Sequence, residues 1–164
     1  VFNADFHAKK CMQEIEELKN QICKAFGNDI YQEERLQKRK LANIVFSDSK
    51  KLQELNNLVH PFVYIAFEEW LKKQESEYVI KEAAILFEGG ANKGLDVVIC
   101  VSSKIELRIK RVMKRDKCTK ERVMKRISMQ MPQETKEKLS DFVIVNDGKQ
   151  LILPQLIKII NQIS

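Results

Sequence analysis

Apolar residues recur along the first half of the chain at spacings of three and four, the period of an amphipathic helix. Val1 to Asp5 begins apolar and ends polar, as the last residues of a buried strand would. Proline disfavours helix for the residue before it, so we expect the third of the helical blocks to be interrupted at His60-Pro61. The predicted blocks are Phe6 to Phe26, about Glu34 to Phe46, and about Ser49 to Trp70.

Short, nearly continuous apolar runs follow in the second half, which is typical of strands in a parallel sheet that is covered on both faces. The runs are Tyr78 to Ile80 leading to Ala83 to Phe87, then Val97 to Val101, then Asp141 to Asn146. Strands that alternate with helices predict an α/β fold with a parallel sheet.

A basic segment lies between two of these strands. Ser103 to Glu106 has the pattern of a capping box and predicts the start of a helix. Thr119 is a candidate for a second helix N-cap, so we expect two helices that meet near Lys117-Cys118. A last amphipathic helix is predicted from about Lys149 to Ile163.

The charge of the basic segment restricts the kind of partner. The whole chain of 164 residues has a net charge of +6, but eleven basic and three acidic residues between Lys104 and Arg126 give that segment +8. Such a segment indicates a polyanionic partner, which is a nucleic acid, an anionic lipid or a phosphorylated small molecule. The segment has no aromatic residue to stack on bases, which disfavours a nucleic-acid-binding module.

Composition adds further limits. No run of about 18 apolar residues is present to span a membrane. The four cysteines form no CxxC pair, which argues against a structural zinc site and a disulfide framework and favours free thiols in a reducing cytoplasm. None of the five glycines belongs to a GxxxxGK(S/T) or GxGxxG motif, so these residues contain no recognisable nucleotide-binding loop.

Several polar residues follow predicted strands, at the edge where open α/β sheets bind ligands. Asp5 can accept a proton from a hydroxyl group, although Asp is also a common helix N-cap. Glu88 lies just past a buried strand and is either a ligand-binding acid or a solvated loop residue. His60 is either a turn residue or part of a site. Arg111 and Arg115 share a helix face and can hold phosphate through planar forks of donors, unless they only form a solvated face.

Seven motifs in order resemble dephospho-CoA kinase. They are Asn3-Ala4-Asp5; Leu36-Gln37-Lys38-Arg39-Lys40-Leu41; Leu58-Val59-His60-Pro61; Leu86-Phe87-Glu88; Arg111 through Arg115-Asp116 to Thr119; Arg126-Ile127-Ser128-Met129-Gln130; and Asp141 to Gly148. The resemblance implies a three-layer P-loop kinase fold, similar to nucleoside monophosphate kinases, with a parallel sheet and a helical lid. It implies a single kinase domain over 1–164, with a helical acceptor-binding region at about 28–75 and a basic lid at about 104–131.

The family transfers the γ-phosphoryl group of ATP to the ribose 3′-hydroxyl of dephospho-CoA, the last step of coenzyme A biosynthesis. The resemblance therefore implies ATP as phosphate donor, Mg²⁺, and a cytoplasmic enzyme without nucleic-acid or membrane partners. A nucleoside monophosphate kinase is the nearest alternative. The implied roles are general base for Asp5; acceptor binding for His60, Leu86, Phe87 and Glu88; phosphate binding for Arg111 and Arg115; and a place near the ATP base for Asn146 and Gly148.

The sequence departs from the family pattern at Asn3, where an acid is usual, at Lys38, where arginine is usual, and at Ala84, where proline is common. Family members also begin with a strand, a phosphate-binding loop and a helix, roughly the 30 residues of one such unit. We expect that unit to precede Val1, and we expect the 164 residues alone to transfer no phosphate.

Overall fold

Residues 1–163 are described by a computed structural model, which divides the chain after Ala84 into the units Val1–Ala84 and Ile85–Ser164. Ser164 lies outside the described residues. Each unit is presented by itself.

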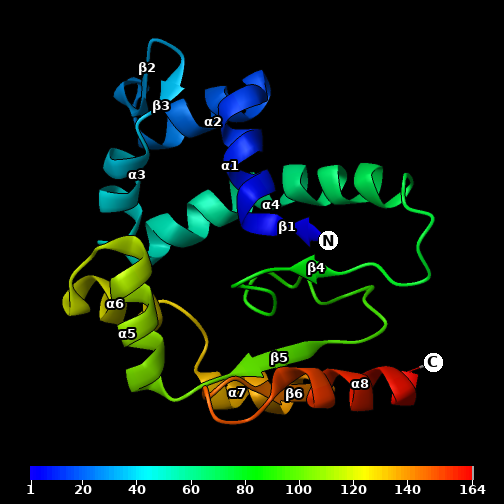
Figure 1. The fold of residues 1–164 in the computed structure, drawn as a ribbon. Coiled ribbons are helices and arrows are strands. Elements are labelled where there is room, and N and C mark those ends of the chain that lie inside the picture. Colours follow the sequence, from blue (N-terminus) through cyan, green and yellow to red (C-terminus); the bar gives the residue numbers. More distant parts are fainter. Residues whose placement is uncertain (164) are drawn as a thin grey trace. The chain divides into compact units, whose positions relative to one another are not determined.

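Three helices of the first unit pack against a fourth, the long helix α4 (Figure 1). The contacts of α4 hold α1, α2 and α3 in place, and the 3-10 turn η1 follows α2. The bounds are α1 Ala4–Glu14, α2 Glu16–Phe26, η1 Asn28–Ile30, α3 Lys38–Val45 and α4 Ser49–Leu71.

Two short strand pairs complete this unit. Strand β1 (Phe2–Asn3) runs parallel to β4 (Lys81–Glu82), in a register that sets Phe2 against Lys81 and Asn3 against Glu82. Strands β2 (Tyr31–Gln32) and β3 (Arg35–Leu36) form an antiparallel hairpin. The parallel β1–β4 pair confirms that a strand ends just before Asp5.

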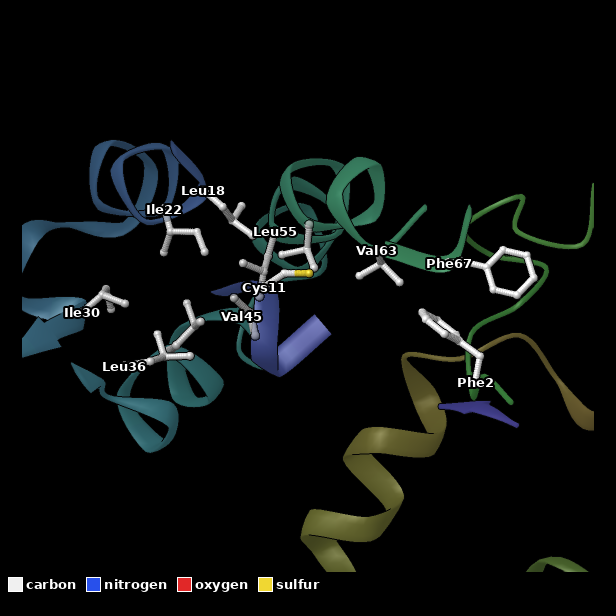
Figure 2. Packing of buried hydrophobic residues seen from close by; sticks show 12 residues of the cluster. Phe2, Cys11, Leu18, Ile22, Ile30, Leu36, Val45, Leu55, Val63 and Phe67 are labelled. Atoms are coloured by element: carbon white, nitrogen blue, oxygen red, sulfur yellow. The ribbon is translucent and has the colours of Figure 1, made fainter. Parts of the chain in front are cut away.

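The core of the first unit is a cluster of apolar side chains from β1, the helices and the hairpin. Phe2, Leu18, Ile22 and Ile30 are fully buried. Figure 2 shows Leu18 and Ile22 on α2 near Leu55 of α4, with Phe2 beside Phe67; the ring centroids of Phe2 and Phe67 are 5.1 Å apart. This packing ties strand β1, and therefore the start of α1, to the long helix.

Four predictions for residues up to Phe87 are wrong in detail. The helix predicted over 6–26 is two helices, because Ile15 has extended backbone (φ −91°, ψ 112°). The block predicted from Glu34 begins instead at Lys38, since Glu33 and Glu34 have positive φ and form the hairpin turn. The run 83–87 is a turn rather than a strand, because only Lys81 and Glu82 pair with β1.

The fourth correction concerns Pro61, which does not interrupt α4. Val59 and Val63 on either side of it are buried in the core, at the spacing of one helical turn. Pro61 itself is exposed. The burial of this apolar stripe therefore outweighs the one backbone hydrogen bond that proline removes.

The second unit is built on a parallel strand pair, β5 (Ile99–Ser102) and β6 (Phe142–Val145), in which Ile99 opposes Phe142. Helix α7 packs on β5, α8 packs on β6, and α5 packs on α6 (Figure 1). The helices are α5 Ile105–Asp116, α6 Lys120–Ser128, α7 Gln133–Leu139 and α8 Ile152–Ile163. Buried apolar residues of this unit are Ile109, Val123, Ile144 and Ile159.

The predicted break between the two basic helices is confirmed, because Lys117 has left-handed backbone and Thr119 is the N-cap residue of α6. The predicted capping box is wrong: Lys104 occupies the N-cap position, and the buried hydroxyl of Ser103 has no hydrogen-bond partner among the described residues. The sequence analysis also missed α7. Helix α8 starts later than Lys149, since the amide of Lys149 donates to the Asp147 carboxylate in a turn.

Candidate functional site

Asp5 lies in the first turn of α1, two residues beyond strand β1. Its side chain is exposed, and no hydrogen bond or ion pair engages its carboxylate among residues 1–163. The turn that carries it is capped by Asn3, whose Oδ1 accepts a hydrogen bond from the Phe6 amide at 2.7 Å. The Asn3 Nδ2 donates to Glu82 Oε2 at 2.6 Å, across the parallel strand pair.

His60 lies midway along α4 and is half-buried. Burial lowers the pKa of its imidazole, and the positive charge of Lys81 lowers it further. Lys81 Nζ itself lies over the Phe67 ring, 4.3 Å from the centroid, and burial lowers the pKa of this ammonium group. His60 therefore favours its neutral form, in which one ring nitrogen donates and the other accepts a hydrogen bond.

Leu86, Phe87 and Glu88 belong to the turn that opens the second unit, and the first two are half-buried. The Glu88 carboxylate accepts a hydrogen bond from the Met131 amide at 2.8 Å and pairs with Lys136 Nζ at 3.2 Å. Only 22% of the Glu88 side chain is exposed. Glu88 is thus held in place by the segment around α7 rather than free in a solvated loop.

Arg111 on α5 contacts the loop that follows β6. Its Nη1 donates to the backbone oxygen of Asn146 at 2.8 Å, and its Nη2 donates to Asn146 Oδ1 at 3.2 Å. The Asn146 amide in turn donates to the Ser102 carbonyl at 2.7 Å. Gly148 has φ +80°, and a Cβ added there would lie 3.7 Å from Arg111 Nη2. Three residues predicted to bind ATP therefore lie together.

Arg115, on the last turn of α5, makes two hydrogen bonds to its neighbour Asp116, at 2.7 and 3.3 Å. The Asp116 carboxylate also accepts from Arg126 Nη1 at 2.8 Å, which connects α5 to α6. The hydrogen bonds from Arg115, followed by that from Arg126, lower the pKa of Asp116 to about 2. Asp116 is therefore an anion that binds the guanidinium groups of Arg115 and Arg126 where α5 ends and α6 follows.

Comparisons with known proteins identify the family of this chain. The dephospho-CoA kinase family model matches residues 1–151. A dephospho-CoA kinase of Bacteroides fragilis is 32% identical over 98% of this chain and 78% of its own length, and that of Chlorobium chlorochromatii is 36% identical over 90% and 74%. The chain belongs to the dephospho-CoA kinase family.

Solved structures agree with that assignment. A crystal structure from Thermus thermophilus matches with a TM-score of 0.81 and 33% identity, over 98% of this chain and 82% of the other. The dephospho-CoA kinase of Campylobacter jejuni matches with a TM-score of 0.64 and 28% identity, over 99% and 84%. The α/β P-loop kinase fold predicted from the sequence is confirmed.

As a member of the dephospho-CoA kinase family, the protein is an ATP-dependent phosphotransferase of coenzyme A biosynthesis, with ATP and dephospho-CoA as substrates. This decides between the two kinases that the sequence left open, against a nucleoside monophosphate kinase. Among the described helices, none is long and apolar enough to cross a membrane.

Sequence reasoning missed several residues around the predicted site. Lys81 and Glu82 were missed because they lie between the two apolar runs that were predicted as strand, whereas the register opposite β1 sets Glu82 beside Asn3. Asp116 was quoted only as part of a motif, yet it holds two arginines. Lys136 lies on α7, which showed no apolar period strong enough to predict a helix.

Proposed function

We propose that Asp5 is the general base of the phosphoryl transfer. Its carboxylate takes the proton of the ribose 3′-hydroxyl as that oxygen bonds to the γ-phosphorus of ATP, and the bond from this phosphorus to its bridging oxygen breaks to release ADP. A carboxylate that is exposed and has no partner among the described residues can meet an incoming hydroxyl group. Positioning and charge stabilisation supply the rest of the catalysis.

The observation that carries the ATP side of this proposal is the contact of Arg111 with Asn146. Two guanidinium N–H groups bind Asn146, which fixes the plane of the fork, and the remaining donors are available for phosphate oxygens. Asn146 and Gly148 lie beside the adenine base of ATP. The positive φ of Gly148 turns the backbone at this point, and the missing side chain lets a flat ring approach.

The basic helices α5 and α6, within about 104–131, form a lid over the phosphates of ATP. Arg115 binds a phosphate when it exchanges its Asp116 partner for the nucleotide. Guanidinium groups held over the phosphates stabilise the charge that the transition state spreads over its oxygens.

The helical region at about 28–75 binds the acceptor dephospho-CoA. His60 offers a neutral ring, and Leu86 and Phe87 offer partly exposed apolar surface. Glu88, fixed by Lys136 and the Met131 amide, accepts hydrogen bonds from the acceptor. The whole of 1–164 acts as one kinase domain.

Mg²⁺ accompanies ATP in this proposal. Residues 1–163 contain no group of three acidic, histidine or cysteine side chains that could cage a metal, but Mg²⁺ needs only one or two carboxylates besides the phosphates. We assign no metal ligand among the described residues, because the Asp5 carboxylate serves as the base. The ion, when bound, neutralises charge on the phosphate oxygens. The four free thiols support a cytoplasmic location, and we assign no nucleic-acid partner.

The decisive experiment compares wild type with Asp5→Asn, in protein expressed from its full reading frame. We expect turnover with saturating ATP and dephospho-CoA to fall at least about 100-fold, the scale of a lost general base. Glu14→Gln, at the other end of α1, is the matched control. Adenosine, AMP and dephospho-CoA are compared as acceptors. Unchanged turnover of the Asp5 variant would remove Asp5 from the mechanism.

A further inference from the structure

Both the oxygen and the nitrogen of the Asn3 side-chain amide form hydrogen bonds. Its oxygen accepts from the Phe6 amide at 2.7 Å, and its nitrogen donates to Glu82 Oε2 at 2.6 Å. Only one orientation of the amide satisfies both contacts, because Glu82 as a carboxylate accepts and the Phe6 N–H donates. Glu82 therefore decides which way Asn3 faces.

The first turn of α1 depends on that orientation. Asn3 is the N-cap, Phe6 is the third helical residue, and Asp5 lies between them. A cap bond that spans Asp5 fixes the backbone from which its carboxylate projects. If Asn3 loses its partner, the amide can turn over and present its nitrogen to the Phe6 N–H, and the cap bond is lost.

The strand pairing makes this contact specific. Asn3 and Glu82 are direct partners in the parallel β1–β4 register, and each is the last residue of its strand. An aspartate at position 3 would cap the helix equally well but would face the Glu82 carboxylate at hydrogen-bond distance. Like charges facing each other in this way repel. The two positions are therefore matched as a donor and an acceptor.

We propose that Glu82 is a positioning residue for catalysis: through Asn3, it holds the first turn of α1 so that the Asp5 carboxylate points to the acceptor hydroxyl. The inference rests on the proposed role of Asp5. Glu82 transfers no proton and touches no substrate in this account.

The test compares wild type with four variants and one control variant, in protein from the full reading frame. Glu82→Gln keeps an acceptor for Asn3 and leaves turnover close to wild type. Glu82→Ala lowers kcat about 10-fold, within the range that a small misplacement of a catalytic group costs, while the KM for ATP is unchanged. Glu69→Ala, which removes an exposed acid from α4, is the matched control.

The decisive part of the test exchanges the hydrogen-bond donor at position 3 with the acceptor at position 82. Asn3→Asp alone lowers kcat because two carboxylates face each other. Asn3→Asp combined with Glu82→Gln recovers kcat, since glutamine donates to the new aspartate, whose other oxygen caps Phe6. A residue that only supported folding would change the melting temperature without this rescue of kcat.

Two results overturn the inference: wild-type kcat in Glu82→Ala, or losses that add in the double variant. Circular dichroism checks that each variant folds. If Glu82→Ala fails to fold, the recovery of kcat in the Asn3→Asp, Glu82→Gln double variant still decides the question. Neither result depends on Asp5→Asn, which tests the general base by itself. If Asp5→Asn retains full turnover, the proposed base fails whatever the cycle gives.

Discussion

Arg111 on α5 donates hydrogen bonds to Asn146 from both terminal nitrogens, one to the backbone oxygen at 2.8 Å and one to the side-chain oxygen at 3.2 Å. The contact joins the basic helix to the loop after β6, so residues 35 positions apart lie together in the proposed nucleotide site. A planar fork is required for this double contact.

Arg111→Lys should therefore weaken ATP binding, because a lysine ammonium group cannot reach both oxygens in the same plane. We expect the KM for ATP to rise about 10-fold, which corresponds to the loss of one hydrogen bond from a charged group. The KM for dephospho-CoA should stay near its wild-type value. Arg35→Lys, an exposed arginine on the β2–β3 hairpin, is the control. An equal rise in the control would separate Arg111 from ATP.

Gly148→Ala should destabilise the loop through its backbone rather than by a clash. The added Cβ would lie 3.7 Å from Arg111 Nη2, an ordinary contact, but φ is +80°. We expect the free energy of unfolding to fall by about 1–2 kcal/mol, the cost of left-handed backbone in a residue with a Cβ. Gly148→Asn should cost less, since asparagine tolerates this region. Chemical denaturation measures both, and equal costs would contradict the argument.

Stability should decline as the pH falls below about 6.5, the ordinary pKa of histidine. Burial lowers the pKa of both His60 and His7 in the folded state, so the unfolded chain binds more protons between the folded and unfolded values. The contribution of the two neutral histidines to the free energy of unfolding is thus fully present above pH 6.5. It is lost as the pH falls through their lowered folded-state pKa values. His60→Gln and His7→Gln should each reduce the slope of melting temperature against pH below pH 6.5. An unchanged slope in both would contradict the prediction.

Leu18→Ala should strongly destabilise the first unit, because Leu18 is fully buried in the cluster that joins α2 to α4. Deleting a buried leucine side chain leaves a cavity and costs about 2–5 kcal/mol of unfolding free energy. Ile65→Ala, at a side chain that is 54% exposed, is the control and should cost little. Urea denaturation measures the difference, and similar losses would show that the cluster is not the core.

The alternation of strands and helices was visible in the sequence because apolar runs and helical spacing reflect burial directly. Val97 to Val101 and Asp141 to Asn146 were predicted as strands, and β5 and β6 lie within or beside those runs. The hairpin before α3 was missed because its turn depends on positive φ at Glu33 and Glu34, residues that rarely adopt it. A local pattern does not reveal such a turn.

In the candidate site too, the features that depend on local sequence were predicted and those that depend on distant segments were not. Asp5 and Arg111 were predicted because their positions after a strand and on a helix face can be read from neighbouring residues. The contacts that orient them could not be predicted, since Glu82 reaches Asn3, and Asn146 reaches Arg111, only through pairing between distant segments. The roles of the site residues in catalysis stay predictions until the variants are measured.

Pro61 in the middle of α4 has one more consequence. Proline carries no amide hydrogen, so the carbonyl of Asn57, one turn earlier, has no helical donor, and the helix is less stiff there. His60 lies directly before this soft point. A small bend of the helix can therefore carry the imidazole sideways without a change of rotamer, and rapid hydrogen exchange at the neighbouring amides would reveal that bending.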